Sequence, residues 1–337
     1  MRRKTGTEFK NENVMNAIQD ILRKRSAASL ELAREHILNM KIETAVARQA
    51  VAAYARDWDD ITHPGILSLA CEAVGGSAEQ AVPLQVAILL LTAAADLHDD
   101  VIDQSRIKNG KPTVLGQFGK DIAILIGDAF FLKGFSLLIQ NEKRIPSETL
   151  RKVIDAIEQA YFEVGNAHLL EASQKGKTDL SPEKYLEILR RKAWNIGVHA
   201  HIGAILGGGT PEEIRALGEG GRAIGVLITL REEFIDIFEP KELLNRFRNE
   251  CLPLPLLYAF ENPNLKRNLL DILLKQRISR KDVSEILCLL VKAKVVEKFR
   301  KRMKALSVEA IESVSCIRNR RAKYEMGLIA SATLEDI

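Results

Sequence analysis

Four aspartates lie at helical spacing in the first third of the chain: Asp96, Asp99, Asp100 and Asp103. On a helix, positions three, four and seven apart lie on one face, so these carboxylates form one acidic stripe. Like charges repel, and a folded protein keeps such a stripe only under a cation or in bulk water. Mg²⁺ takes carboxylate oxygens and shares its remaining positions with water and phosphates. The stripe therefore predicts a Mg²⁺ and diphosphate site; the alternative is a solvated helix end.

The helix that carries the stripe is expected to be buried, and a basic loop follows it. Residues 86–95 are apolar on every helical face except at Thr92, which is the pattern of a helix inside a larger helical protein. The loop that follows contains Arg106, Lys108 and Lys111. Burial of the helix disfavours the solvated alternative, and the basic loop favours an anionic ligand.

Helical periodicity dominates the rest of the chain. Apolar residues recur every three or four positions, and no stretch shows the alternation of a strand. Ser181 followed by Pro182 is a good helix start. The helical pattern is clear in residues 14–38, 43–54, 122–138, 150–172, 183–205 and 221–238. No low-complexity linker or tandem repeat divides residues 1–337, so we predict one large all-α domain of ten or more helices.

Composition excludes several classes of protein. The chain has 337 residues, a net charge of +4 and only 5% aromatic residues, which disfavours a nucleic-acid binder. No signal peptide is evident, and no apolar run is expected to reach the roughly 20 residues that span a bilayer. The four cysteines fit neither a zinc site nor a disulfide framework, which favours a reducing cytoplasm.

The ordered motifs resemble those of the trans-isoprenyl diphosphate synthases over about residues 58–258. The carrying motifs are Asp99-Asp100-Val-Ile-Asp103, Gly110-Lys-Pro-Thr113, Phe118-Gly119 and Gly127-Asp128-Ala129. The resemblance implies a helical domain with a central cavity, Mg²⁺ as cofactor, and a homo- or heterodimer with a related subunit. It also implies the reaction: an allylic prenyl diphosphate ionises, and isopentenyl diphosphate attacks to give a longer trans-polyprenyl diphosphate.

The resemblance also implies roles for single residues. Asp99, Asp100 and Asp103 would hold Mg²⁺ as catalytic ligands. The second aspartate-rich motif of the family appears as Glu232-Glu233-Phe-Ile-Asp236, so Glu232 and Asp236 would be weaker metal ligands.

Two lysines would contact the allylic diphosphate. Lys108 stands where the family has the first of two arginines, and Lys192 stands at the family's diphosphate-binding lysine. For Lys192 the alternative is a solvated helix charge.

The isopentenyl diphosphate half of the family pattern is changed. Asp60 and His63 stand in place of the lysine and arginine of the Gly-Lys-x-x-Arg-Pro segment, Thr92 in place of a histidine, and Asn109 in place of the second arginine. Asp60 in particular would repel a diphosphate where a lysine would attract it.

Several functional hypotheses follow from this loss. The first is one subunit of a heteromeric synthase. The second is a homomeric synthase that binds isopentenyl diphosphate through Arg56, His63 or Arg106. A non-catalytic regulatory subunit is the third, and a class I terpene cyclase, disfavoured by the segment Gly110-Lys-Pro-Thr113, is the fourth.

The residues before the first aspartate bear on product length. In the resembled family they form the floor of the cavity, and here they are Ala95 and Ala94. A helix rises about 5.4 Å per turn, which is roughly one isoprene unit. Small residues there predict a product longer than farnesyl, with Leu91 or Ile88 as a plug. The alternative is that these alanines only permit close helix packing.

Overall fold

Side-chain caps begin several of the helices. Ser77 Oγ accepts a hydrogen bond from the backbone N–H of Gln80 at 3.3 Å. Ser181 Oγ accepts one from Lys184 N–H at 3.2 Å, just before Pro182 at the first helical position. Such caps satisfy an N–H that has no partner within the first turn, and proline at that position costs no hydrogen bond. The predicted helix start at Ser181 and Pro182 is therefore confirmed.

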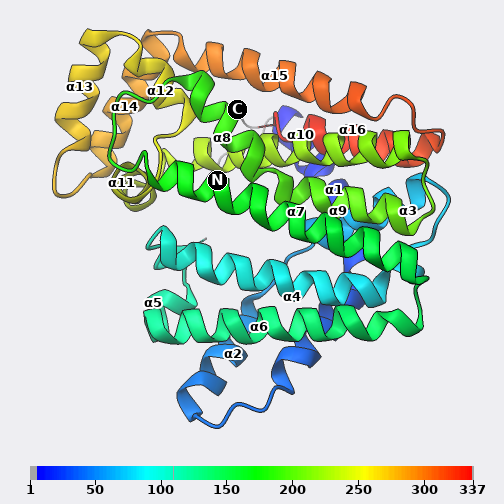
Figure 1. Ribbon diagram of the computed structural model, residues 1–337. Coiled ribbons are helices and arrows are strands. Elements are labelled where there is room, and N and C mark those ends of the chain that lie inside the picture. The colour runs from blue at the N-terminus through cyan, green and yellow to red at the C-terminus, as the bar shows by residue number, and fades with distance from the viewer. Residues whose placement is uncertain (1–5, 109, 336–337) are drawn as a thin grey trace.

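The computed structural model describes residues 6–108 and 110–335, and these are almost entirely helical (Figure 1). The predicted all-α class is thereby confirmed. The helices are α1 (Gly6–Leu38), α2 (Ala45–Asp57), α3 (Thr62–Ala73), α4 (Ala78–Ile102), α5 (Val114–Phe118), α6 (Lys120–Gln140), η1 (Asn141–Lys143), α7 (Ser147–Ala172), α8 (Pro182–Lys192), α9 (Trp194–Leu206), α10 (Pro211–Asp236), α11 (Pro240–Asn249), α12 (Leu254–Phe260), α13 (Pro263–Leu273), α14 (Arg280–Lys292), α15 (Val295–Ser313) and α16 (Arg320–Ala332). A short antiparallel hairpin, β1 (Ile107–Lys108) and β2 (Lys111–Pro112), follows α4.

Two clusters of buried apolar side chains form the core. One lies among α3, α8 to α10 and α12 to α16 and includes Tyr185 and Phe299. The other lies among α2, α4, α6 and α7 and includes Phe130. Helices α3 and α9 contribute residues to both clusters. In Figure 1, α4 and α6 lie side by side, with α2 outside α6. The helix that carries the aspartate stripe is thus held by packing on several sides.

Close helix contacts depend on glycine at two crossings. A Cβ at Gly134 of α6 would lie 2.9 Å from the carbonyl oxygen of Ala87 in α4, and one at Gly203 of α9 would lie 2.1 Å from the carbonyl oxygen of Leu67 in α3. Because interiors are packed to crystal-like density, any side chain at these positions would push the helices apart.

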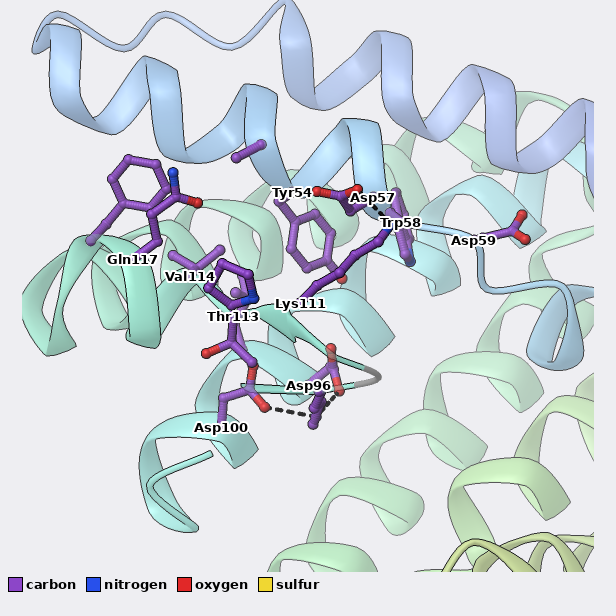
Figure 2. Close-up of a pocket in the computed structure, with 15 residues that line it drawn as sticks. Tyr54, Asp57, Trp58, Asp59, Asp96, Asp100, Lys111, Thr113, Val114 and Gln117 are labelled. Atoms are coloured by element: carbon purple, nitrogen blue, oxygen red, sulfur yellow. Dashed lines mark hydrogen bonds and ion pairs between the residues drawn. The ribbon is translucent and has the colours of Figure 1, made fainter. Parts of the chain in front are cut away.

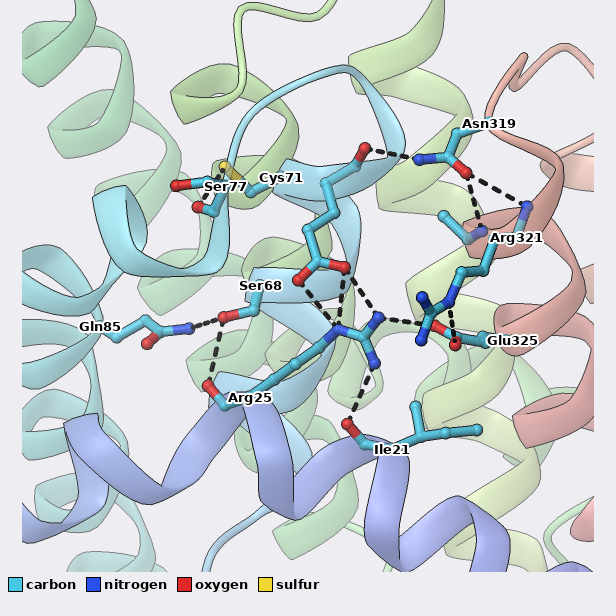
Figure 3. A network of polar contacts seen from close by, with 11 residues as sticks. Ile21, Arg25, Ser68, Cys71, Ser77, Gln85, Asn319, Arg321 and Glu325 are labelled. Atoms are coloured by element: carbon cyan, nitrogen blue, oxygen red, sulfur yellow. Dashed lines mark hydrogen bonds and ion pairs between the residues drawn. The ribbon is translucent and has the colours of Figure 1, made fainter.

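The N-terminal helix is joined to both α3 and α16 by one buried arginine (Figure 3). The guanidinium of Arg25 binds Glu72 at 2.7 Å and Glu325 at 2.7 Å, and it also donates to the carbonyl of Ile21 at 3.1 Å. The Arg25 and Glu325 side chains are only 8% and 7% exposed. Removing one partner would leave a buried charge unpaired, so this contact fixes α1 against the rest of the chain.

The predicted helix over residues 183–205 is interrupted at Ala193, which separates α8 from α9. Ala193 has ψ −5°, far from the usual helical value of about −42°. Beside it, Asn195 Oδ1 accepts a hydrogen bond from the N–H of Ile196 at 2.7 Å. Local side-chain bonds of this kind compete with the helical ladder, and apolar periodicity does not register them.

The sequence expectation about apolar runs needs correction for two helices. Ala78–Ile102 and Lys120–Lys143 are long and apolar enough to cross a membrane by length and composition alone. Of their most apolar windows, 67% and 39% respectively are buried inside the protein. A core helix passes the same test, so these two helices by themselves establish no membrane span.

Candidate active site

The four aspartates of the stripe lie at the C-terminal end of α4 and divide into two pairs. Asp103 caps the helix through its own N–H, which donates to the carbonyl of Asp99 at 2.8 Å. Asp100 and Asp103 are buried, with 4% and 6% of their surface exposed, whereas Asp96 is exposed. Asp96 and Asp100 face the hairpin, and Asp99 and Asp103 face α7. Each pair has its own cations.

The first pair is held by Lys108 from the hairpin. Its Nζ lies 2.9 Å from Asp96 Oδ1 and 2.7 Å from Asp100 Oδ1. The hairpin is fixed at its base, because Thr113 donates its N–H to the carbonyl of Arg106 at 3.0 Å and its hydroxyl to that of Ser105 at 2.7 Å. The two carboxylates outweigh burial and raise the pKa of Lys108, so it stays a cation.

A cavity of about 300 Å³ lies beside this pair, between α2, α4 and the hairpin. Figure 2 shows Asp96 and Asp100 on one side of it and Tyr54 and Asp57 on the other. Lys111 crosses the hairpin side and lies 2.9 Å from Asp57 Oδ1. The cavity thus combines carboxylates with lysines whose partners an incoming anion would replace.

The second pair is surrounded by basic side chains from α7, the loop after it and α8. Asp99 Oδ1 lies 3.2 Å from His168 Nδ1, and Asp103 Oδ1 lies 3.3 Å from Lys175 Nζ. Lys192 binds Glu171, which is 6% exposed. The charge of Lys192 also acts on both aspartates.

Burial governs the charge of these carboxylates. Loss of hydration disfavours the ionised form and raises the pKa of Asp100 and of Asp103 to about 7. The pKa of Asp99 is shifted the other way. Burial would raise this pKa, but the nearby positive charges, above all that of Lys192, lower it. Burial therefore favours protonation of Asp100 and Asp103, while the surrounding positive charges favour the ionised form of Asp99.

Asp99, Asp100 and Asp103 form what we call the first aspartate cluster. Their carboxylates fit a hard divalent cation that binds together with a phosphate group. In the described residues, no three His, Cys, Asp or Glu side chains converge closely enough to hold a metal by themselves. Mg²⁺ is usually bound by one or two carboxylates and completes its shell with water and substrate phosphates. Oδ1 of Asp99 and Oδ1 of Asp100 are buried without a hydrogen bond in good geometry, although they lie 3.2 Å from His168 Nδ1 and 2.7 Å from Lys108 Nζ. These are the oxygens that such an ion would use.

The second acidic motif lies at the end of α10. Glu232 is exposed, and its charge acts across to Lys108. Asp236, by contrast, is bound at 2.7 Å by the guanidinium of Arg246 from α11. The two residues predicted as metal ligands are therefore in different environments.

Asp60 and His63, which stand where the family is expected to contact isopentenyl diphosphate, pair with each other. His63 Nδ1 lies 2.8 Å from Asp60 Oδ2. Burial opposes protonation of His63, but Asp60 outweighs it and raises the pKa of His63. The His63 ring also lies 4.7 Å from that of His199, which in turn contacts Thr92 at 3.3 Å. The charge of Asp60 is therefore compensated within the protein.

The other cations considered for isopentenyl diphosphate lie elsewhere. Arg56 is exposed and binds Asp57 at 2.9 Å, and Arg106 is exposed at the start of the hairpin. Asn109 lies outside the described residues. These positions and the Asp60–His63 pair provide no group of cations comparable to Lys108, Lys175 and Lys192.

The two alanines before the motif have different surroundings. Ala94 is completely buried and shares the α4 face of Ala87 and Leu91, which packs against Gly134 of α6. In this structure Ala94 makes close packing contacts, and its predicted role in substrate binding stays a prediction. Ala95 is exposed and lies one turn from Thr92, on the face of α4 toward α9.

Several residues of the site were not found from the sequence. His168, Glu171, Lys175 and Glu250 all lie more than 60 positions from the aspartates they influence, whereas Arg246 lies ten positions from Asp236. The only signal for Arg246 was that the segment after the second motif departs from the family pattern. Charged residues brought together from separate helices leave no local pattern in the sequence.

The fold and the site together define a class: an all-helical protein in which an aspartate cluster at the end of a buried helix, ringed by lysines, suits a metal-bound diphosphate. Solved structures share this fold. The geranylgeranyl pyrophosphate synthetase of Pyrococcus horikoshii Ot3 has a TM-score of 0.83 at 24% identity, covering 96% of this chain and 99% of that one. A polyprenyl synthase of Caulobacter crescentus CB15, complexed with calcium and isoprenyl diphosphate, has a TM-score of 0.77 at 20% identity, covering 94% and 97%.

The sequence comparison identifies the family. The polyprenyl synthetase model matches residues 62–290. The short chain isoprenyl diphosphate synthase of Methanothermobacter thermautotrophicus is 31% identical over 69% of this chain and 70% of its own length, while two other curated relatives are matched over 58% and 55% of their length. The chain belongs to the polyprenyl synthetase family. The predicted family and the predicted class of enzyme, a prenyl diphosphate synthase, are confirmed.

Proposed function

We propose that the chain binds an allylic prenyl diphosphate with Mg²⁺ at the first aspartate cluster, for condensation with isopentenyl diphosphate to a longer trans-polyprenyl diphosphate. The observation that carries this proposal is the cluster of the buried Asp100 and Asp103 and the partly buried Asp99, with Lys108 and Lys192 beside it. Such a cluster favours a ligand that brings a metal ion, because the metal places positive charge beside the carboxylates.

The bound metal would neutralise negative charge that grows on the departing diphosphate. Asp99, Asp100 and Asp103 would hold the metal. Lys108 and Lys192 would exchange carboxylate partners for phosphate oxygens, since charge-assisted bonds to an ammonium are strong with either anion. As fixed cations in a site with little water, they would stabilise the leaving group without reorganising.

We further propose that the chain works as one subunit of a dimer, with a related subunit supplying the isopentenyl diphosphate site. An apolar row on α6 supports a dimer: Leu125, Leu132 and Ile139 recur every seven residues and are 62–72% exposed. On α7, Phe162 and Leu169 are 67% and 70% exposed. Exposed apolar surface of this extent is typical of a protein interface. The pairing of Asp60 with His63 favours a related partner over a second identical copy.

The dimer proposal predicts dependence on a partner. The purified chain, assayed alone with Mg²⁺, isopentenyl diphosphate and allylic primers, is expected to show no turnover above background. Activity is expected when a related synthase subunit with an intact Gly-Lys-x-x-Arg-Pro segment is added. Robust turnover by the chain alone would exclude an obligate partner and establish the homomeric alternative. The regulatory alternative would be established by two results together. The partner subunit is active alone, and its activity with this chain is the same whether this chain is wild type or carries Asp103→Asn.

Product length provides a further prediction, which concerns Ala95 alone. Its small exposed side chain on α4 leaves room for a growing hydrocarbon chain, and we propose a product longer than farnesyl. Ala95→Phe is expected to shorten the product by at least about one isoprene unit, because one helical turn matches that length. Chromatography of the dephosphorylated products measures it, with Ala95→Ser as the control. An unchanged product length in Ala95→Phe would contradict the proposal.

We propose a cytoplasmic location. Cys71 and Cys251 are buried, Cys288 and Cys316 are exposed, and all four are free thiols. Exposed free thiols persist where the compartment keeps them reduced.

A further inference from the structure

The second acidic cluster of the site already contains a cation. Arg246, on α11, lies among three carboxylates: its Nη2 is 2.7 Å from Asp236 Oδ2, and its Nη1 is 2.8 Å from Glu250 Oε2 and 3.5 Å from Glu233 Oε1. Its Nε also donates to Asp236 Oδ2 at 2.8 Å. The Arg246 side chain is 17% exposed and that of Glu233 only 4%. The guanidinium is thus inside the cluster, not at its edge.

The neighbouring residues fix this arrangement. The hydroxyl of Tyr185, which is 2% exposed, donates to Glu233 Oε1. Asn245, next to Arg246 on α11, donates to Glu250 Oε1 at 3.1 Å and lies 3.5 Å from the carbonyl oxygen of Asp103. The cluster around Arg246 is therefore connected to the end of α4, where the first aspartate cluster lies.

A divalent cation does not fit this second cluster. Arginine keeps its charge at any physiological pH and presents a rigid fork of donors that suits carboxylates. Arg246 binds Oδ2 of Asp236 and Oε2 of Glu250, and Asn245 donates to Oε1 of Glu250, so three of these four carboxylate oxygens already have a donor. A metal placed among them would lose ligands and face a positive charge at short range. Glu232 lies outside these contacts with Arg246, so it would have to hold a metal without a second carboxylate from the motif.

We propose that the guanidinium of Arg246 takes the place of a metal ion in the second acidic cluster, so that metal enters this site only at the first cluster. This inference rests on the proposed function and deepens it. It assigns Arg246 as a positioning residue whose fixed charge holds Asp236, Glu233 and Glu250 together whether or not a diphosphate is bound. The two clusters then differ in the source of their positive charge. The first cluster binds metal together with the ligand, whereas the second contains the guanidinium of Arg246.

The test counts bound Mn²⁺ by electron paramagnetic resonance, using the full chain with Mn²⁺ and inorganic pyrophosphate as probes. In the wild-type background, Asp236→Asn is expected to leave the number of bound Mn²⁺ unchanged. Arg246→Gln is expected to gain one Mn²⁺, which the further change Asp236→Asn removes. Arg248→Gln is the matched control on the same helix, because Arg248 donates to the carbonyls of Lys275 and Gln276, and it is expected to bind as wild type.

Two results would overturn the inference. The first is a loss of Mn²⁺ on Asp236→Asn in the wild-type background, which needs no Arg246 variant and decides the question even if Arg246→Gln fails to fold. The second is an Arg246→Gln chain that is folded by circular dichroism and gains no Mn²⁺. A separate variant, Asp103→Asn, tests the proposed function. It is expected to bind less Mn²⁺, and an unchanged number of bound Mn²⁺ would contradict the first cluster as a metal site. The result for Asp236→Asn is judged independently of this one.

Discussion

Replacing Asp103 with asparagine is expected to lower the rate of prenyl transfer at least about 100-fold, the loss typical when one group that stabilises developing charge is removed. Asparagine has the same size but no charge, and the site beside Lys175 and Lys192 would hold the metal and its diphosphate less well. Initial rates with saturating isopentenyl diphosphate, in the presence of the partner subunit where one is needed, measure the effect.

Asp155→Asn is the matched control, because Asp155 is exposed on α7 and far from the cluster in sequence and role. It is expected to retain the wild-type rate. An Asp103→Asn protein with a rate equal to that control would show that the first cluster takes no part in catalysis.

Replacing Lys192 with methionine is expected to lower both stability and diphosphate binding. Lys192 is 23% exposed and pairs with Glu171, whose side chain is 7% exposed. Breaking a buried pair by removing one partner leaves the other charge uncompensated, which costs about 3 kcal/mol. Urea unfolding measures the stability, and titration with inorganic pyrophosphate and Mg²⁺ measures the binding.

A double variant separates these two effects. Lys192→Met with Glu171→Gln removes both charges and is expected to recover most of the stability while binding of pyrophosphate stays weak. Arg191→Met, at an exposed neighbour on α8, controls for loss of a surface charge and is expected to change stability by less than about 0.5 kcal/mol. If Lys192→Met behaved like Arg191→Met, the solvated-charge alternative for Lys192 would be correct.

The sequence predicted those features of the molecule that depend on residues near one another in the chain. Spacing placed Asp96 to Asp103 on one helix, and the Ser181-Pro182 pair marked a helix start, because faces and caps are set within one or two turns. The basic loop after α4 was also local, and Lys108 does reach the aspartates.

Features that depend on packing between distant helices were not predictable in this way. Periodicity did not show that Asp99 and Asp103 face His168 and Lys175, or that Arg246 lies among the second set of carboxylates. It also did not distinguish Ala94, buried in the packing of α4, from the exposed Ala95. Neighbours that are adjacent on a helix point in different directions, and only the packed structure shows what each one meets.

The distribution of charge supports the proposal that the chain binds the allylic diphosphate and not isopentenyl diphosphate. Lys108, Lys175 and Lys192 lie beside the first cluster, and a diphosphate could take their ammonium groups as partners. In the second cluster three carboxylates share the guanidinium of Arg246, and Asp60 is paired with His63. An anionic ligand that brings metal is therefore attracted to the first cluster, while the other two positions offer it little.

The central claim is that the first aspartate cluster binds an allylic diphosphate through a divalent metal. It is tested most directly by calorimetric titration of the chain with a non-hydrolysable thiodiphosphate analogue of farnesyl diphosphate, with Mg²⁺ and then with the metal chelated. We predict binding that requires Mg²⁺ and is lost in an Asp99→Asn, Asp103→Asn double variant. Equal affinity without metal, or undiminished affinity in the double variant, would contradict this account.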